Sequence, residues 1–589
     1  MRWTARTRTG VACGAVALLF TIYSARLVDL QFAKHDAYSR LAAEKHTMRQ
    51  VIHARRGLIF DRNGELLASN LPVRTVVADG SRIKDPEAMA RLAAPLLDMT
   101  EAEFLGKISS DRKYIVIRRE LAEDHAAVLE KVLADANMRG LYFEKDAVRT
   151  YPNGQMLGHV LGFLDHENSG VQGIELTMDS SLRGKDGYRY IERDRTGREI
   201  LLYRGQEEPA ENGFNVRLTI DMGLQSIVEE ELEATFHDLK PEMAVAILAN
   251  PKTGEILAMA NRPCFDPNHP GDAKPVQMKN RAIIDMVEPG STFKIVVASA
   301  ALTEGTVKEN TPIFCENGAF SYGGKVLRDH HGYGTMNVHD ILVKSSNIGS
   351  AKMALMMGDT KFYEYVRRFG FGEKTGIELP GEIPAVVHPP HRWDKLTITR
   401  MPMGHSVTAT PLQITMGMSV IANGGNLMAP QIVKSVEDSD GRVVYDKPPK
   451  VVRSVIPRKT ARFVSRALGG VVGQGGTAQL ARVAGFTAAG KTGTAQKASP
   501  AGGYAPGKYI VSFVGYLPEE DPQFVCLVLV DEAKIPAGLN YGGLVAAPVF
   551  SRIGERVARH LDLVPALRAE SVAPLALGTG TTERGDVTR

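Results

Sequence analysis

Cysteine is scarce in this chain, and its few copies are scattered. There are four in 589 residues, and no two form a C-x-x-C pair (Cys13, Cys264, Cys315 and Cys526). This spacing argues against a disulfide-built scaffold and against a zinc module. The net charge is also small, at +4, so composition gives no reason to expect nucleic acid as a partner. Hydrophobic residues at 44% and charged residues at 23% exclude a mostly disordered chain.

A long apolar segment lies at the amino terminus. Arg2, Arg6 and Arg8 precede an uncharged run from Val11 to Ala25, and further apolar residues extend it to Leu30. Because about 20 helical residues cross a bilayer, residues 11–30 are predicted to form a transmembrane anchor. Basic residues before the span place residues 1–10 in the cytoplasm and the rest of the chain outside it. A cleaved signal peptide is the alternative, since the strictly apolar core is short.

Composition divides the rest of the chain into three parts. The polar stretch RGQEEPAENG marks a boundary near residue 210, so residues 31–210 and 211–560 are expected to be separate domains. The small, polar residues 561–589 predict a disordered tail. In the second domain, strand-like segments stand at both ends, with about 200 residues of helical pattern between them. This order predicts an α/β fold with one antiparallel sheet flanked by helices.

Local signals place several elements within these domains. Turn residues at 61–64 and 251–254 separate pairs of apolar runs and predict two hairpins. Asp221 is expected to cap a helix. Helical periodicity covers residues 82–137. Near the carboxyl end, three segments have the character of strands (488–497, 509–518 and 523–532).

An S-x-x-K pattern is the first candidate for chemistry. Ser291 and Lys294 follow a Pro-Gly break and open an apolar helix. Lys294 lies on the same helix face as Ser291, one turn away. Burial and the helix N-terminus lower the pKa of a lysine, and a neutral amine can activate a serine as a nucleophile. The pattern alone is weak, because Ser110 and Lys113 match it without such a setting.

Two further motifs follow along the chain. Ser345-Ser346-Asn347 opens another apolar helix, where hydroxyl and amide groups are usually only caps. K-T-G occurs three times, and only the copy at Lys491 continues with a further hydroxyl, Thr494, and strand character. A lysine and threonines there can bind a carboxylate, while Gly493 admits close approach of the backbone.

The same Lys491 also completes a P-loop pattern, G-x-x-x-x-G-K-[ST], beginning at Gly485. A P-loop needs a helix after the lysine, and the Pro- and Gly-rich residues that follow cannot form one. The order of the motifs favours a different interpretation. S-x-x-K, S-x-N and K-T-G follow one another at separations of 54 and 146 residues, an arrangement typical of β-lactamases and penicillin-binding proteins.

The chain resembles a class B penicillin-binding protein, a monofunctional peptidoglycan DD-transpeptidase, from the anchor to about residue 555. RGLIFDRNGELLA, YPNGQMLGHVLGF and GVQGIE resemble the family's non-catalytic pedestal, whereas NRAIIDMVEPGSTFK and AGKTGTAQK resemble its transpeptidase domain. Glu288 and Asn347 give the motifs E-P-G-S-T and S-S-N, which resemble those of the family's septal, cell-division type. Two departures flank the site: Ser406 stands where the family commonly has glycine, and GEIPA lacks a usual following glycine.

The resemblance implies a transpeptidase fold, an elongated α+β pedestal at residues 31–210, and one transmembrane helix. It implies a serine acyl-enzyme that cross-links stem peptides ending in D-Ala-D-Ala and is inhibited by β-lactams, with no cofactor and no metal. The implied partners are lipid-linked precursor strands, division-machinery membrane proteins and a glycosyltransferase, at the septum of a bacterial inner membrane. The implied catalytic residues are Ser291, Lys294, Ser345, Asn347 and Lys491, and the implied substrate-binding residues are Thr492, Gly493 and Thr494.

Three alternatives share some or all of these residues. A DD-carboxypeptidase or β-lactamase would use water as the acceptor. A β-lactam sensor would share the serine and the lysine. A catalytically silent division scaffold is the non-enzymatic alternative.

Overall fold

The computed structural model describes residues 4–36, 47–108, 112, 114–193, 199–202, 207–498, 503–536 and 538–565. Two compact units are present. Residues 1–56 and 183–213 make the first, and residues 57–182 and 214–589 make the second. The predicted tail beyond residue 565 and the second S-x-x-K pair, Ser110 and Lys113, lie outside the described residues.

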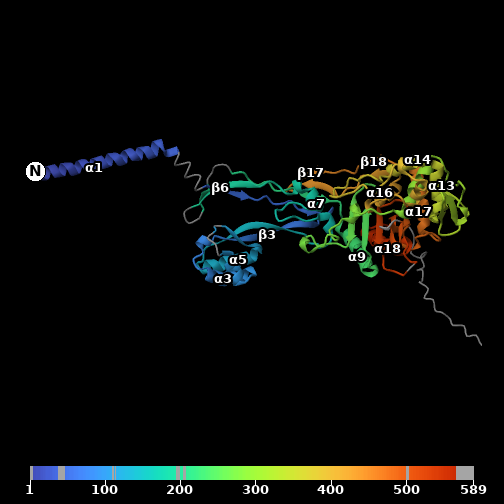
Figure 1. The fold of residues 1–589 in the computed structure, drawn as a ribbon, viewed down its shortest axis with the longest axis horizontal. Coiled ribbons are helices and arrows are strands. Elements are labelled where there is room, and N and C mark those ends of the chain that lie inside the picture. Colours follow the sequence, from blue (N-terminus) through green and yellow to red (C-terminus); the bar gives the residue numbers. More distant parts are fainter. Residues whose placement is uncertain are drawn as a thin grey trace, which may run out of the picture. The chain divides into compact units, whose positions relative to one another are not determined.

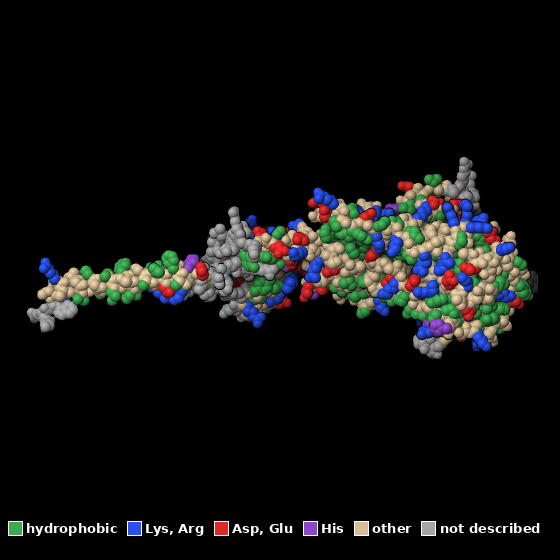
Figure 2. All heavy atoms as spheres, turned by 90° about the horizontal axis from the view of Figure 1, so that it is seen from above, with side chains coloured by type: hydrophobic (Ala, Val, Ile, Leu, Met, Phe, Trp, Pro, Cys, Tyr) green, Lys and Arg blue, Asp and Glu red, His purple; other side chains and the backbone are tan. Residues whose placement is uncertain are grey.

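The first unit contains the amino-terminal helix and a small sheet. Helix α1 (Ala5–Val28) continues through one π-helical turn to Ala33, and this apolar helix is long enough to cross a membrane. Its side chains are exposed, and Figure 2 shows hydrophobic side chains along it, with charged side chains near its ends. The sheet is antiparallel in the order β1-β6-β7 (Thr47–Ile52, Gly187–Arg193 and Glu199–Leu202).

The second unit, which holds every helix labelled in Figure 1 except α1, is built around a five-stranded antiparallel sheet in the order β10-β9-β21-β20-β19. Its strands are the predicted hairpin and the three predicted carboxyl-terminal strands (β9 Met243–Ala249, β10 Ile256–Arg262, β19 Ala489–Ala498, β20 Tyr504–Leu517 and β21 Phe524–Asp531). Strands β9, β10 and β21 are buried throughout, because helices cover both faces. Helices α9 (Met222–Leu239) and α18 (Gly542–His560) pack on one face, and α16 (Pro411–Ala422) packs on the other.

Between β10 and β19 helices make up most of the regular secondary structure, as predicted. These helices pack against one another and share one hydrophobic core with the sheet. They are α10 (Arg281–Ile284), α11 (Lys294–Thr303), α12 (Val338–Val343), α13 (Asn347–Met357), α14 (Asp359–Arg368), α15 (Thr397–Arg400), α16 and α17 (Arg458–Val472). Three short antiparallel strand pairs accompany them: β11–β14 (Ile313–Phe314, Thr335–Met336), β12–β13 (Ala319–Tyr322, Lys325–Arg328) and β15–β18 (Asn426–Met428, Val451–Ser454).

A second sheet runs through the amino-terminal part of this unit in the order β17-β16-β8-β2-β3-β4, and β5 pairs with β3. The predicted turn at 61–64 joins β2 to β3, and Asp221 caps α9 as expected, accepting a hydrogen bond from the Leu224 N–H. The helical prediction for 82–137 is wrong in part, because β4 lies between α4 and α5 and pairs with β3. The bounds are β2 Ile59–Phe60, β3 Leu66–Ala78, β4 Ile115–Ala122, β5 Leu141–Thr150, β8 Asn215–Leu218, β16 Val433–Glu437, β17 Val443–Asp446, α3 Pro86–Ala93, α4 Glu101–Ile108 and α5 Glu123–Asp135.

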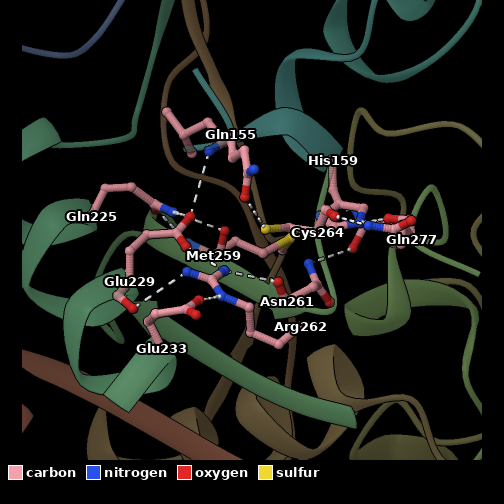
Figure 3. Close-up of polar contacts among 12 residues, drawn as sticks. Gln155, His159, Gln225, Glu229, Glu233, Met259, Asn261, Arg262, Cys264 and Gln277 are labelled. Carbon is pink, nitrogen blue, oxygen red and sulfur yellow. Dashed lines mark hydrogen bonds and ion pairs between the residues drawn. The ribbon is translucent and has the colours of Figure 1, made fainter. Parts of the chain in front are cut away.

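The YPNGQMLGHVLGF segment is held by polar contacts to α9 and to the residues that follow β10 (Figure 3). It contains the short helix α6 (Gly158–Leu161), and α7 (Gly173–Thr177) and α8 (Asp179–Leu182) follow it. The Cys264 thiol donates to Gln155 Oε1 at 3.2 Å, and His159 Nε2 lies 2.6 Å from the Gln277 carbonyl oxygen. Beside them, the buried Arg262 pairs with Glu229 at 2.5 Å. This motif therefore joins the core of the second unit.

Candidate active site

The Ser291 segment forms a tight turn against the edge strand β19. Gly290–Phe293 is a 3₁₀ turn, and α11 begins at Lys294, so the predicted helix start is confirmed. Gly290 has φ 58°, and a Cβ there would lie 2.9 Å from the Thr494 carbonyl oxygen. A Cβ on Gly493 would lie 2.9 Å from the Pro289 carbonyl oxygen. Glycine at both positions therefore lets the serine turn and the K-T-G strand touch through their backbones.

Lys294 is fully buried, and its amine faces the S-x-N motif. Its Nζ donates to the Ser345 carbonyl oxygen at 2.5 Å, to Ser345 Oγ at 3.0 Å and to Asn347 Oδ1 at 2.8 Å. No hydrogen bond within the described part of the chain joins it to the Ser291 hydroxyl. The contact expected from helical spacing is therefore not made in this structure, where the amine is bound by three acceptors of the S-x-N motif.

The S-x-N residues lie at the beginning of α13. Ser346 is the N-cap and accepts a hydrogen bond from the Gly349 N–H at 2.9 Å, which confirms the capping interpretation for this residue. Ser345 has φ 58°, a conformation that serine rarely adopts. The Asn347 amide donates to the Arg328 carbonyl oxygen at 2.9 Å. The motif therefore caps the helix and also presents a hydroxyl and an amide oxygen to Lys294.

Lys491 lies within β19 and is as completely buried as Lys294. Its Nζ donates to Ser345 Oγ at 3.0 Å and approaches Thr492 Oγ1 at 3.4 Å. The Thr494 hydroxyl accepts a hydrogen bond from the Gly542 N–H at 3.3 Å. Because β19 continues as a strand to Ala498, the P-loop interpretation is excluded.

The other two K-T-G copies lie elsewhere. Lys252 stands in the turn between β9 and β10 and pairs with Asp521 at 2.6 Å. Lys374 follows α14 in a loop.

Two buried amines around one hydroxyl make the electrostatics of the site unusual. Burial lowers the pKa of Lys491 to about 7. Burial, and then repulsion from Lys491, lower the pKa of Lys294 well below its ordinary value, and the Asp329 carboxylate opposes this shift. An amine of this kind can be neutral near neutral pH and can accept a proton.

The structure adds Asp329, which sequence reasoning missed, and gives the contacts of Glu288, which the sequence marked only as a residue of the septal type. Asp329 accepts hydrogen bonds from the Ser346 hydroxyl and from the backbone at the start of α13. Glu288 accepts from the Ser406 N–H at 3.0 Å and lies 2.8 Å from His405 Nδ1. Ser406 has φ 60°, which fits the glycine expected at this position. Asp329 is a single aspartate in a loop rich in histidine and glycine, and no sequence pattern marks it. Ser406, which stands where the family commonly has glycine, is a sequence feature that directs attention to its partner Glu288.

Comparison with known proteins agrees with this geometry. Residues 244–555 match the penicillin binding protein transpeptidase domain, and residues 51–218 match the penicillin-binding protein dimerisation domain. Stage V sporulation protein D of Bacillus subtilis is 33% identical over 91% of this chain and 83% of its own length. Peptidoglycan D,D-transpeptidase FtsI of Escherichia coli is 30% identical over 95% of this chain and 92% of its own.

Solved structures show the same fold. Penicillin binding protein 3 from Mycobacterium tuberculosis, complexed with aztreonam, has a TM-score of 0.69 and 27% identity, and the match covers 88% of this chain and 99% of that one. Penicillin Binding Protein 2X from Streptococcus thermophilus has a TM-score of 0.74 and 25% identity, and the match covers 87% of this chain and 80% of that one.

A five-stranded sheet between helices, with serine, lysine and asparagine gathered at its edge strand, defines a penicillin-binding transpeptidase domain. The chain belongs to the class B penicillin-binding proteins, the D,D-transpeptidases that combine this domain with a dimerisation domain. The family resemblance and the α/β fold class expected from the sequence are both confirmed. Among the residues that the structure describes, one helix, at the amino terminus, is long and apolar enough to span a membrane.

Proposed function

We propose that this protein cross-links peptidoglycan stem peptides during septal wall synthesis through an acyl-enzyme on Ser291. One observation carries the proposal: the hydroxyl of Ser345 lies 3.0 Å from each of two buried lysine amines, beside the turn that holds Ser291. Such a cluster can pass a proton from a nucleophile to a leaving group without water.

Acylation begins when a neutral Lys294 takes the proton of the Ser291 hydroxyl. The serine oxygen attacks the carbonyl between the two terminal D-alanines, and the backbone N–H groups of Ser291 and Thr494 stabilise the oxyanion. The peptide C–N bond then breaks, and Ser345 with Lys491 returns the proton to the departing D-alanine. Asn347 holds the peptide amide.

Deacylation transfers the acyl group to an amine of a neighbouring stem. The amine attacks the ester carbonyl, the ester bond breaks, and the serine regains a proton as the cross-link forms. Thr492 and Thr494 bind the terminal carboxylate of the donor, and Gly493 allows the strand to approach it.

The cellular setting is also a proposal. The septal assignment is supported by Glu288, Asn347 and the similarity to FtsI. We infer that residues 1–10 lie in the cytoplasm, that 31–210 form the pedestal and that 211–560 form a periplasmic transpeptidase domain. The proposed partners are lipid-linked precursor strands, division-machinery membrane proteins and a glycosyltransferase. Inhibition by β-lactams is supported by the M. tuberculosis relative, whose structures hold aztreonam and ampicillin.

Peptide mapping of a penicillin adduct tests the assignment of the nucleophile. The full chain in detergent should be labelled by a fluorescent penicillin at Ser291, and Ser291→Ala should abolish labelling while the melting temperature stays near that of the wild type. Ser110→Ala, in the second S-x-x-K pair, is the matched control and should label normally. An adduct at Ser110, or labelling that persists in Ser291→Ala, would refute the assignment.

Product analysis then separates the proposed reaction from its alternatives. A cross-linked dimer from stem peptides supports transpeptidation. Release of D-alanine to water alone would indicate a carboxypeptidase. A chain that is never labelled would be a silent scaffold.

A further inference from the structure

The Asp329 carboxylate is the acidic group whose charge acts on the buried Lys294 amine. It follows β13 and receives three hydrogen bonds, from the Ser346 hydroxyl at 2.6 Å, the Asn347 N–H at 2.5 Å and the Ile348 N–H at 3.1 Å. Two of the donors are the first free N–H groups of α13, so the carboxylate binds the positive end of this helix.

These hydrogen bonds act directly on the S-x-N motif. Ser346 and Asn347 follow Ser345, whose strained φ of 58° must be maintained by its surroundings. Arg328 precedes Asp329 in the chain, and its carbonyl oxygen accepts a hydrogen bond from the Asn347 side-chain amide at 2.9 Å. The orientation of Asn347 Oδ1 and Ser345 Oγ toward the Lys294 amine therefore depends on residues 328 and 329.

We propose that Asp329 is a positioning residue of the transpeptidase reaction, which fixes the start of α13 so that Ser345 and Asn347 are presented to Lys294. This inference rests on the proposed function of the same site. Asp329 touches neither Ser291 nor the predicted substrate-binding threonines through any described hydrogen bond, so it acts through the S-x-N motif.

The charge of Asp329 gives the proposal a second, independent consequence. The carboxylate raises the pKa of Lys294 against the lowering effects of burial and of Lys491 on β19. His330 is the neighbouring titratable group: burial, and then the charges of Lys294 and Lys491, lower its pKa, whereas Asp329 raises it. Removing the negative charge should lower the pKa of Lys294 further, so that the amine becomes neutral at a lower pH.

The experiment measures the acylation rate of the full chain by a fluorescent penicillin between about pH 5 and pH 9. Asp329→Asn should slow acylation about 10- to 100-fold, the cost of a small misplacement of reacting groups. It should also move the acid limb of the rate profile to lower pH. Asp329→Glu keeps the charge and should keep the wild-type midpoint despite a reduced rate.

Asp394→Asn is the matched control. Asp394 also accepts two backbone N–H groups and one hydroxyl, from Leu396 and Thr397 at the start of α15, but it contacts neither lysine. This variant should acylate at the wild-type rate with the wild-type midpoint.

Two results would overturn the proposal. One is an Asp329→Asn variant with the wild-type rate and profile. The other is a slower variant whose midpoint is unchanged and whose melting temperature falls, which indicates a purely structural cap. Failure of the proposed function has a different signature, because the wild type itself would then lack the Ser291 adduct.

Discussion

At the residue scale, the site holds two lysines that the fold has made unusual. Lys294 and Lys491 are both inaccessible to solvent and share Ser345 Oγ as an acceptor. Two ammonium groups this close repel each other, so at least one of them is readily deprotonated. Because Lys294 stands at the start of the helix after Ser291, it is the better candidate for the base.

Replacing Lys294 by arginine tests this role. Arginine keeps the positive charge but does not deprotonate in proteins, so Lys294→Arg should lose acylation by fluorescent penicillin by at least about 100-fold. Lys497→Arg on the same strand is the control, because Lys497 is an ion-pairing lysine bound to Glu242 and Asp531. If folded Lys294→Arg acylates at nearly the wild-type rate, the lysine acts only through its charge, and Lys491 becomes the candidate base.

At the scale of elements, the short helix α6 carries the buried His159. Its ring hydrogen-bonds to Gln277, in the segment that follows β10 (Figure 3). Burial lowers the pKa of His159 to about 4, and its hydrogen bond to the Gln277 carbonyl oxygen only partly opposes that shift. The folded chain thus keeps His159 neutral at a pH where the unfolded chain protonates it.

The stability of the fold should therefore fall below about pH 6.5, the ordinary pKa of histidine. Between this value and about pH 4, the unfolded state binds more protons than the folded state, so unfolding becomes easier as pH falls. At about pH 5 the loss from this one residue is about 2 kcal/mol.

Thermal melting of His159→Gln at about pH 7.5 and pH 5 measures this effect. The variant should lose less stability on acidification than the wild type, because glutamine can donate to Gln277 without titrating. His237→Gln, at an exposed position of α9, should behave like the wild type. An equal pH dependence in all three proteins would contradict the prediction.

At the scale of the whole molecule, the amino-terminal helix decides where the chemistry takes place. If residues 11–30 form an uncleaved anchor, the mature protein keeps Met1 or Arg2 and stays in the membrane fraction at high salt. Salt screens charge interactions and would release a peripheral protein, whereas an apolar span of this length needs detergent. A reporter that is active only in the periplasm should function when fused after residue 565.

Amino-terminal sequencing can contradict the prediction of an uncleaved anchor. A soluble protein that begins between Ser24 and Gln31 would have a cleaved signal peptide. The chemistry at Ser291 would stand in that case, but the anchor would be lost.

Sequence patterns predict the elements that depend on short-range signals. The hairpin around residues 251–254, the carboxyl-terminal strands and the start of α11 follow from turn residues, alternation and a Pro-Gly break, all of which act within a few residues. The helical prediction for 82–137 is wrong where β4 lies, because β4 is stabilised by pairing with β3 and not by its own periodicity.

The order of the three motifs along the chain is enough to indicate Ser291, Lys294, Ser345, Asn347 and Lys491 as candidates. Only the tertiary structure decided that Ser345 stands between the two lysines, that the Lys294 amine hydrogen-bonds to the S-x-N motif, and that Asp329 holds the start of α13. The physical reason is that motif residues up to 200 positions apart meet only through packing of the sheet edge against the helices. Burial in that packing, which no local pattern encodes, also sets the pKa of each lysine.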